Sequence, residues 1–310
     1  MSRIYEALRR SRGDLSDVAR RALPDEQVEA AELPPGTEAA DGLSIEAFDR
    51  ASPTPARFEG PISGFELPAL DSLRAVRVRL RAGMPLLPFG GEDRVAAEQY
   101  RIIRTKLIQH PKRPRTVAIS SAEAGDGKSV SAVNLAGALA LNPEFSVLLI
   151  DGDLHRTSLA SYFNLPARPG LSEVLDGQAA LHETIVRIEP YPNLYFSPGG
   201  HSPRGPADLL NSQRWPQLLE ALRRQFTYVI IDTPPAGALA DFDLIEAQCE
   251  GVILVVRQDH TKRALWRKAL SAVPQQKLIG VVVNCVKPWF LGRLFGYYNN
   301  YEYSKYYRSE

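Results

Sequence analysis

The sequence predicts an α/β fold in which a mostly parallel sheet is covered by helices on both faces. Five short apolar runs, each typical of a buried strand, recur along the chain, and helical patterns separate them. Such a strand–helix–strand succession builds parallel sheets, in which ligands bind at the carboxyl ends of the strands. The runs span 117–119, 147–150, 228–231, 252–256 and 278–283, and the helical patterns span 131–141, 212–225 and 261–270.

Residues 1–90 are expected to form a largely irregular extension before this region. Proline, alanine and glutamate recur there without sustained hydrophobic periodicity, which is typical of a linker. The first dozen residues differ, because Ile4, Tyr5 and Leu8 share one face of a helix and basic residues follow. Two interpretations of this short helix stay open, a docking helix for a partner or a helix that frays in isolation.

Composition bounds the class of protein. With 310 residues, of which 44% are hydrophobic and 24% charged, the chain can bury a large core. A formal net charge of +1 gives no global electrostatic case for nucleic acid, and we expect no such partner. Cys249 and Cys285 lie beside or within apolar runs, which fits a reducing cytosol. Because no run approaches ~18 apolar residues and no signal-peptide core opens the chain, we expect a cytoplasmic protein.

A glycine-rich turn after the first run carries the clearest chemical signal. The segment TVAISSAEAGDGKS reads as an apolar strand, a turn and a helix that opens at Lys128 and Ser129. The spacing is that of a P-loop, with Ala122 in place of the usual first glycine. Gly125 and Gly127 let the backbone turn its N–H groups toward phosphate oxygens, and the helix adds its positive N-terminal end. We expect the lysine at the β/γ-phosphates and the serine on Mg²⁺; the alternative is a plain glycine turn with a solvated lysine. The nucleotide-binding residues expected from this loop are Ala124, Gly125, Asp126, Gly127, Lys128, Ser129 and Val130.

Acidic residues follow two further runs. Asp151 and Asp153 come directly after run 147–150, and Asp232 follows run 228–231. A hydrophobic strand that closes on aspartate is the Walker B arrangement, in which the carboxylate helps to hold Mg²⁺. Asp151 and Asp153 lie two positions apart, so in an extended segment both point to one side. One can then bind metal while the other accepts a proton, whereas a helix cap or a turn is the alternative for a lone aspartate.

With these motifs, residues 92–286 resemble the bacterial tyrosine kinases of exopolysaccharide and capsule synthesis, which are P-loop proteins unrelated to eukaryotic kinases. The P-loop carries the resemblance together with VLLIDGDLHR, which looks like the Walker A′ motif of that family, and FTYVIIDTPP. The segments NLYFSPGG and PADLLNS are also similar. The resemblance implies ATP and Mg²⁺ as cofactors, and it leaves the division of roles between the two aspartates of the Walker A′ motif open. It implies catalytic roles for Lys128, Asp151 and Asp153, and a metal shell of Ser129, Asp151 and Asp232.

Three positions depart from related proteins. The P-loop has AGDG where the family more often has PGEG, and His155 stands where a second arginine is common. Neither change removes a group that the reaction needs. Glu123 occupies the position of the signature lysine of cell-division and partitioning ATPases, the MinD/ParA superfamily. Those ATPases use that lysine across a nucleotide-sandwich dimer, so its absence argues against their class.

Two further motifs are similar to known elements. Glu98, Arg101 and Arg104 match an E-x-x-R-x-x-R element, and their spacing of three places them on one helical face. The resemblance implies that this face mediates ring-like self-association; the alternative is a solvated face with an intrahelical pair. Asn284, after run 278–283, resembles a nucleotide-base contact, and a turn asparagine is equally consistent.

The end of the chain is dense in tyrosine. Half of the 12 tyrosines fall in the last 14 residues, at positions Tyr297, Tyr298, Tyr301, Tyr303, Tyr306 and Tyr307. A terminus is a place where burial is not expected. Beside a kinase-like site we interpret the cluster as phosphoacceptors, with an aromatic docking tail as the alternative. Each phosphate adds close to two negative charges, which disfavours an assembled ring by repulsion.

The sequence thus predicts an extension (1–90), a P-loop kinase domain (91–286) and a tyrosine-rich tail (287–310). The expected function is an ATP-dependent protein-tyrosine autokinase that regulates exopolysaccharide or capsule synthesis and phosphorylates its own tail in trans. The resemblance implies a separate membrane activator of the chain-length-regulator type, which recruits the kinase to the inner face of the membrane, as well as a homo-oligomer and a cognate tyrosine phosphatase. The alternatives are a MinD/ParA-like ATPase switch or adaptor without kinase activity, and an inactive scaffold of an export complex.

Overall fold

The computed structural model describes residues 5–7, 65–79 and 94–286, and within these ranges nine strands form one sheet. The strand order is β1-β9-β8-β3-β7-β4-β6-β5-β2, and neighbours are parallel except in the pairs β1–β9 and β5–β6. The strands are β1 (Tyr5–Ala7), β2 (Ala75–Arg77), β3 (Thr116–Ser121), β4 (Val147–Asp151), β5 (Val186–Glu189), β6 (Leu194–Ser197), β7 (Tyr228–Asp232), β8 (Gly251–Arg257) and β9 (Leu278–Asn284).

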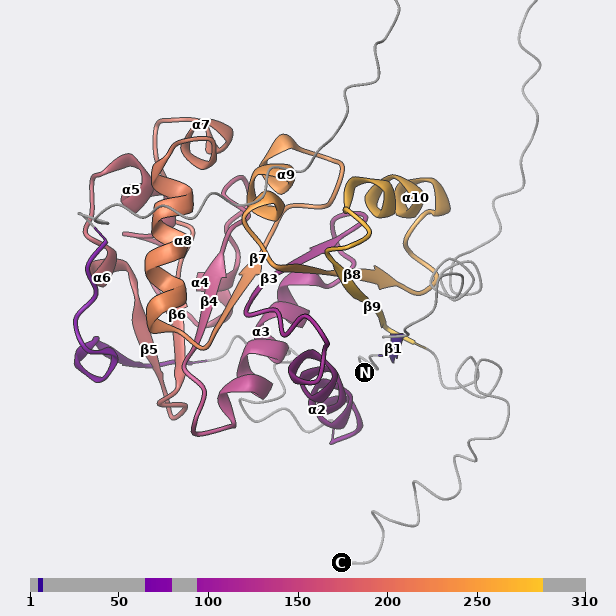
Figure 1. Ribbon diagram of the computed structural model, residues 1–310, viewed down its shortest axis with the longest axis horizontal. Helices are drawn as coiled ribbons and strands as arrows, with labels where there is room; N and C mark the ends of the chain where they lie inside the picture. The colour runs from indigo at the N-terminus through magenta and orange to yellow at the C-terminus, as the bar shows by residue number, and fades with distance from the viewer. Residues whose placement is uncertain (1–4, 8–64, 80–93, 287–310) are drawn as a thin grey trace, which may run out of the picture.

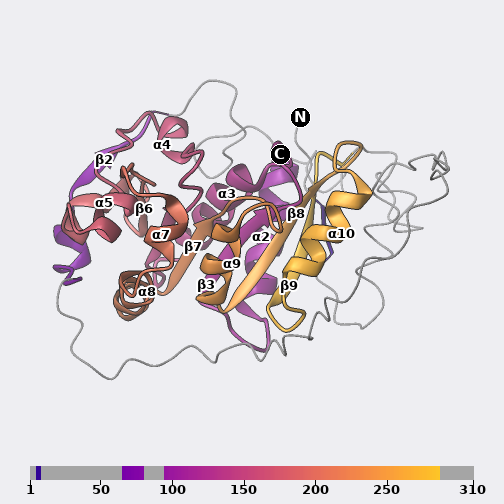
Figure 2. The same ribbon diagram turned by 90° about the horizontal axis from the view of Figure 1, so that it is seen from above.

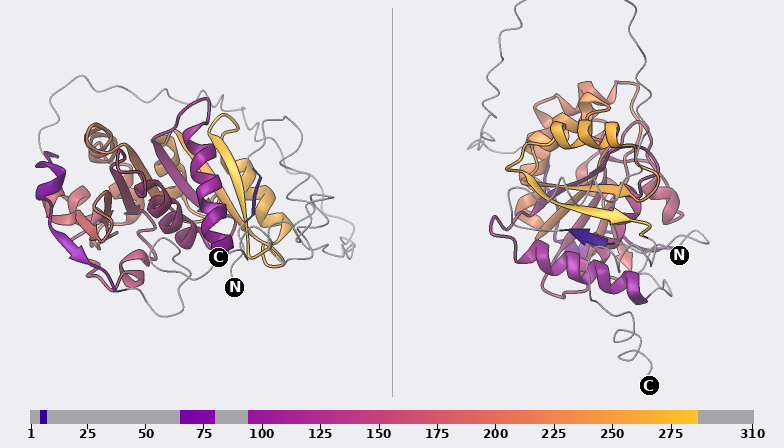
Figure 3. Two further views of the ribbon diagram at one scale, coloured as in Figure 1. Left: turned by 90° about the horizontal axis from the view of Figure 1, so that it is seen from below. Right: turned by 90° about the vertical axis from the view of Figure 1, so that its right-hand side faces the viewer.

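Helices cover both faces of this sheet (Figure 1). Seen from above, α2 and α3 lie on one side of it and α8, α9 and α10 on the other (Figure 2). The end view in Figure 3 shows the sheet between α10 and α2. The helices are α2 (Arg94–Ile108), α3 (Lys128–Ala140), α4 (Leu159–Tyr162), α5 (Leu171–Asp176), α6 (Leu181–Thr184), α7 (Pro206–Leu210), α8 (Arg214–Gln225), α9 (Ala240–Ala247) and α10 (Arg263–Ala272), with a 3₁₀ turn, η1, at Leu70–Ser72.

The core consists of two apolar layers, one on each face of the sheet. Val117 and Ile119 of β3 pack with residues of α2 and α3, whereas Ala118 between them packs with residues of α8, α9 and α10. This alternation follows from the pleat, which sends successive side chains to opposite faces. Because both faces are buried, the central strands are mostly apolar, and this confirms the predicted fold class. All five apolar runs form strands, and the three helical patterns form most of α3, α8 and α10.

The extension before residue 91 is not wholly irregular. Residues 65–79 pack against the sheet: Phe65 and Leu73 are buried, and β2 pairs with β5. The guanidinium of Arg214 lies over the Phe65 ring, 4.9 Å from its centroid, an arrangement that favours a cation–π attraction. The expectation of a linker is therefore wrong for this segment, because its few apolar residues find partners far along the chain.

The prediction of a short N-terminal helix is also wrong for the residues that the structure describes. Tyr5–Ala7 is a strand, antiparallel to β9 with Tyr5 opposite Val283. Pairing with a distant strand overrides the local helical pattern here. The rest of the predicted helix, most of the extension and all six tail tyrosines lie outside the described residues. Among the helices that the structure does describe, none has the length and apolar character needed to cross a membrane.

Candidate active site

The sheet brings the predicted acidic residues to the P-loop. The P-loop follows β3, β7 pairs with β3, and β4 pairs with β7 so that Asp151 lies opposite Asp232. The carboxyl ends of these three parallel strands therefore meet at one edge of the sheet. Polar groups far apart in the sequence become neighbours there, as the sequence predicts.

The P-loop backbone has the shape of a phosphate cradle. Gly125 and Gly127 have φ values of 93° and 95°, in the left-handed region that favours glycine. Gly127 is the N-cap residue of α3, so the unpaired N–H groups of the first helical turn open at the loop. A side chain at position 127 would collide with the amide of Asn284. Ala124 belongs to the loop, and Val130 belongs to the first turn of α3.

Lys128 lies among the acidic residues. Its Nζ is 2.9 Å from Asp153 Oδ2, 3.4 Å from Asp232 Oδ1 and 3.3 Å from the hydroxyl of Ser129. Burial lowers the pKa of the lysine, but the charges of Asp232 and Asp153 outweigh it, so that the pKa lies above its ordinary value. The ammonium group is thus held charged at the end of the cradle.

Asp151 is fully buried and only half satisfied. Its Oδ2 accepts hydrogen bonds from the backbone N–H groups of Ser158, at 2.9 Å, and Leu159, at 3.0 Å, whereas its Oδ1 has no hydrogen-bond partner. Burial, and after it the charge of Asp232, raises the pKa of Asp151 to about 7. Burial also raises the pKa of Asp232, against the charge of Lys128.

The site therefore carries a surplus of negative charge. When ionised, the three carboxylates of Asp151, Asp153 and Asp232 face the single ammonium of Lys128. An oxygen without a partner and a surplus of carboxylates fit a hard divalent cation such as Mg²⁺, which takes oxygen ligands. The predicted metal ligand Ser129 donates a hydrogen bond to Asp232, so its hydroxyl lies at the same place.

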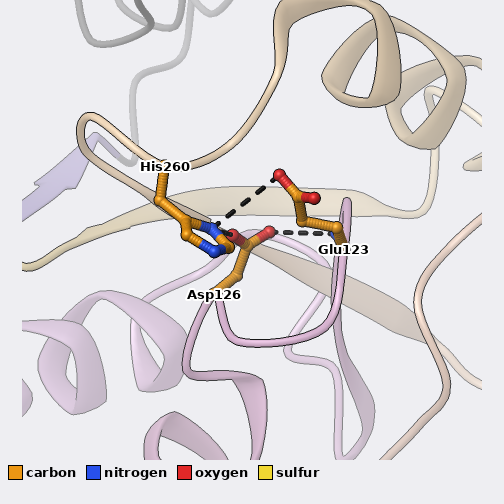
Figure 4. Close-up of side chains that lie close together, drawn as sticks. All are labelled: Glu123, Asp126 and His260. Atoms are coloured by element: carbon orange, nitrogen blue, oxygen red, sulfur yellow. Dashed lines mark hydrogen bonds and ion pairs between the residues drawn. The ribbon is translucent and has the colours of Figure 1, made fainter.

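The carboxylate of Asp126 is held by groups around the P-loop. It accepts a hydrogen bond from Thr261 Oγ1 at 2.7 Å and another from the backbone N–H of Glu123 at 3.1 Å. It also pairs with His260 Nδ1 at 3.2 Å (Figure 4). Burial raises the pKa of this carboxyl group. The side chain of Asp126 thus ties the P-loop to the loop between β8 and α10.

Two further side chains hold the P-loop by its carbonyl groups. Asn284 Nδ2 donates to the backbone oxygen of Asp126 at 2.9 Å, and Arg257 Nη1 donates to that of Gly125 at 3.2 Å. Asn284 therefore supports the loop, and its contact with a nucleotide base stays a prediction. Sequence reasoning missed Arg257, His260 and Thr261, because no local pattern marks side chains that act on a loop about 130 positions away.

The predicted oligomerisation residues lie on α2 as expected. Glu98 and Arg101 form an exposed ion pair of 2.8 Å within the helix. Arg104 differs, because its Nη1 donates to the backbone oxygen of Ala138 at 3.2 Å, near the end of α3. Arginine at this position satisfies a carbonyl group of the last helical turn. His155, where a second arginine is common in the family, pairs with Asp241 at 3.0 Å.

Comparisons with known proteins identify the family of the chain. A family model described as an AAA domain matches residues 114–262. The chain is 39% identical over 181 residues to the tyrosine-protein kinase ptk of Acinetobacter johnsonii, a match of 58% of this chain and 24% of the relative. It is 33% identical over 207 residues to the tyrosine-protein kinase CpsD of Streptococcus agalactiae, a match of 66% of this chain and 89% of the relative.

A solved structure gives the same result. The BceF tyrosine kinase domain superposes with a TM-score of 0.58 at 30% identity, covering 71% of this chain and 93% of that one. The chain therefore spans about a quarter of the Acinetobacter relative, most of the streptococcal relative and nearly all of the solved kinase domain.

Proposed function

The chain belongs to the family of bacterial tyrosine-protein kinases of capsule and exopolysaccharide synthesis, and from this premise we propose that it transfers the γ-phosphoryl group of ATP to tyrosines in the tail of a neighbouring copy. The observation that carries the proposal is the convergence of Lys128 with three strand-end carboxylates behind a phosphate cradle. This reaction needs no covalent enzyme intermediate, because positioning and charge neutralisation supply the catalysis.

The phosphates of ATP bind at the P-loop in this proposal. The N–H groups at the start of α3 and the ammonium of Lys128 supply positive charge to the β- and γ-phosphates. In the absence of nucleotide Lys128 pairs with Asp153 and Asp232, so it must exchange these partners for phosphate oxygens. The surrounding acids keep it protonated before this exchange.

Ser129, Asp151 and Asp232 are the residues that would hold Mg²⁺. The unpartnered Oδ1 of Asp151 and the surplus of carboxylates support this assignment. When bound, Mg²⁺ neutralises charge on the β- and γ-phosphates.

We assign the tyrosine hydroxyl to Asp153 and the metal to Asp151. Two backbone N–H groups hold Asp151 in place, whereas Asp153 Oδ2 is released when Lys128 moves to the phosphates. Asp153 then accepts the hydroxyl proton as the phenolic oxygen bonds to the γ-phosphorus and the bond from that phosphorus to ADP breaks. The tyrosines of residues 297–307 are the proposed acceptors.

The proposed assembly has three partners. A membrane activator of the chain-length-regulator type recruits the kinase to the inner face of the membrane, copies of the chain associate through the face of Glu98, Arg101 and Arg104, and a cognate tyrosine phosphatase reverses the modification. The Glu98–Arg101 pair is exposed, so it can open and re-form between subunits at little cost. Phosphorylated tails then loosen the ring by charge repulsion.

Transfer of labelled γ-phosphate from Mg-ATP to the purified chain tests the proposal. We expect label on the tail, mapped by mass spectrometry, and its loss in K128M, in D151N and in a variant with all six tail tyrosines changed to phenylalanine. K112M is the matched control, because Lys112 Nζ bonds to the carbonyl group of Gln276, far from the P-loop. ATP hydrolysis without any label, even with the activator present, would instead indicate a switch-type ATPase.

A further inference from the structure

A second cluster of metal-ligating side chains lies on the P-loop, apart from the catalytic acids. It consists of Glu123 and Asp126 of the loop and His260 from the segment between β8 and α10 (Figure 4). His260 Nδ1 lies 3.2 Å from Asp126 Oδ1 and 3.8 Å from Glu123 Oε1. One ligand atom from each residue lies within 4.8 Å of the other two.

We propose that Glu123, Asp126 and His260 bind a divalent transition-metal ion, with Zn²⁺ as the best fit, that joins the P-loop to the β8–α10 segment. A tetrahedral Zn²⁺ with bonds of about 2.0–2.1 Å holds its ligand atoms about 3.3–3.4 Å apart. The two separations from His260 Nδ1, 3.2 Å to Asp126 Oδ1 and 3.8 Å to Glu123 Oε1, bracket this value. Small side-chain rotations are therefore enough to form the site.

The donor set distinguishes this site from the proposed Mg²⁺ site. It offers one imidazole nitrogen beside two carboxylates, and imidazole suits Zn²⁺, whereas Mg²⁺ prefers oxygen ligands alone. Both carboxylates pair with the same imidazole, so a divalent ion supplies positive charge that a single histidine does not.

The surroundings orient the ligands and leave access. Asp126 is fully buried, and Thr261 Oγ1 and the backbone N–H of Glu123 fix its two oxygens by hydrogen bonds. Such outer partners are what holds a metal ligand in its binding geometry. The side chains of Glu123 and His260 are 23% and 39% exposed, so an ion can enter from solvent and keep water as its fourth ligand.

Metal binding would replace the contact between His260 and Asp126. The ring nitrogen Nδ1 then gives its lone pair to the ion, which requires the neutral imidazole. Because the ion binds the folded chain and joins two segments, we expect it to raise the melting temperature of the protein.

Calorimetric titration of Zn²⁺ into the metal-free full chain, with excess Mg²⁺ present, tests the site. We expect one tightly bound ion per chain, and a loss of affinity of at least about 10-fold in H260Q and in E123Q, as the removal of a ligand should cause. Glutamine at position 260 keeps the capacity to hydrogen-bond to Asp126, and unfolding curves of the metal-free variants check the fold. Co²⁺ provides a second readout through the visible absorption of a tetrahedral site.

H155Q is the matched control. His155 also pairs with a carboxylate, Asp241, at 3.0 Å and its side chain is 44% exposed, but it lacks the second acid of the cluster. We expect H155Q and D151N to bind Zn²⁺ as the unaltered chain does. The proposal is overturned if no ion binds, if H260Q and E123Q bind it with unchanged affinity, or if D151N is the variant that loses it. None of these outcomes depends on kinase activity.

Discussion

Two fully buried aspartates lie at the P-loop end of the sheet, and they differ in how the oxygens of their carboxylates are hydrogen-bonded. Asp126 has three partners, Thr261, His260 and the N–H of Glu123, and both of its oxygens are satisfied. Asp151 accepts two backbone hydrogen bonds on one oxygen and none on the other. Burial raises the pKa of both carboxyl groups. In the metal-free chain, a buried carboxylate whose oxygens are all satisfied supports the structure, whereas one with a free oxygen can take a ligand without giving up a partner.

The largest effect that follows from this comparison is on activity. Changing Asp151 to Asn should lower phosphoryl transfer by about 100-fold or more, because the metal site loses an anionic ligand. The same change should leave the nucleotide-free protein at least as stable as before at neutral pH, since it removes one of two facing charges. Single-turnover transfer and urea unfolding check the two halves. A strongly destabilised D151N would show that Asp151 is structural, as we infer for Asp126.

The pH dependence of stability should report Asp151. Its pKa of about 7 in the folded chain lies above the ordinary 3.8, so the folded state binds more protons in this range. The free energy of unfolding without nucleotide or metal should therefore fall, by roughly a few kcal/mol at most, as the pH rises from about 4 to about 7. Asp126 and Asp232, whose pKa values are also raised, act with the same sign.

Urea unfolding at a series of pH values measures this slope. The slope should be smaller in D151N and in the presence of saturating Mg²⁺, which favours the ionised carboxylate. An identical slope in D151N would mean that other groups cause it.

Changing Asp126 to Asn should give the reverse of the effects at Asp151. The amide places an NH₂ group against at least one of its present donors, which should cost about 1–3 kcal/mol of stability. Nucleotide affinity should fall as well, because the P-loop loses its tie to Thr261 and His260. Thermal unfolding and titration with ADP measure the two effects. Full stability in D126N would remove the distinction between the two aspartates.

The smallest effects concern α2, where two arginines show the same contrast between satisfied and available groups. Changing Arg104 to Ala should cost about 1 kcal/mol, because its bond to the Ala138 carbonyl is lost. Changing Arg101 to Ala should alter stability by less than about 0.5 kcal/mol, since its pair with Glu98 is exposed. If Arg101 serves self-association, sedimentation velocity should nonetheless show smaller assemblies in R101A. Assemblies of unchanged size would indicate that Arg101 forms only an ion pair within the helix and does not serve self-association.

The fold could be predicted from the sequence wherever a strand is buried on both faces. Runs such as 147–150 and 252–256 are continuously apolar and alternate with amphipathic helices, so their pattern is local. The strands β2, β5 and β6 have only three or four residues, too few to carry a periodic pattern. The helix prediction for Tyr5–Ala7 was wrong for a related reason, because the conformation of this segment depends on β9, nearly 280 residues away.

The candidate site shows the same limit. Asp151 and Asp232 follow apolar runs directly, Lys128 ends the glycine-rich turn after another run, and the parallel arrangement brings the three together. The sequence does not show which carboxylate oxygen of Asp151 lacks a partner, since the N–H groups that satisfy the other oxygen come from the N-cap and the first residue of α4. The partners of Asp126 come from another crossover of the sheet, and only the packed structure identifies them.

The pairing of β1 with β9 affects how shortened forms of the chain will behave. In the described sheet β1 alone borders the outer side of β9. A chain trimmed to begin after Ala7 would present the backbone groups of residues 281–283 as an open sheet edge, and open edges pair with one another. Two trimmed copies can then pair through β9 and form a dimer whose interface does not include α2. In measurements of assembly size on trimmed protein, this dimer would be taken for the native association. In the full chain β1 covers the edge, so such a dimer does not form.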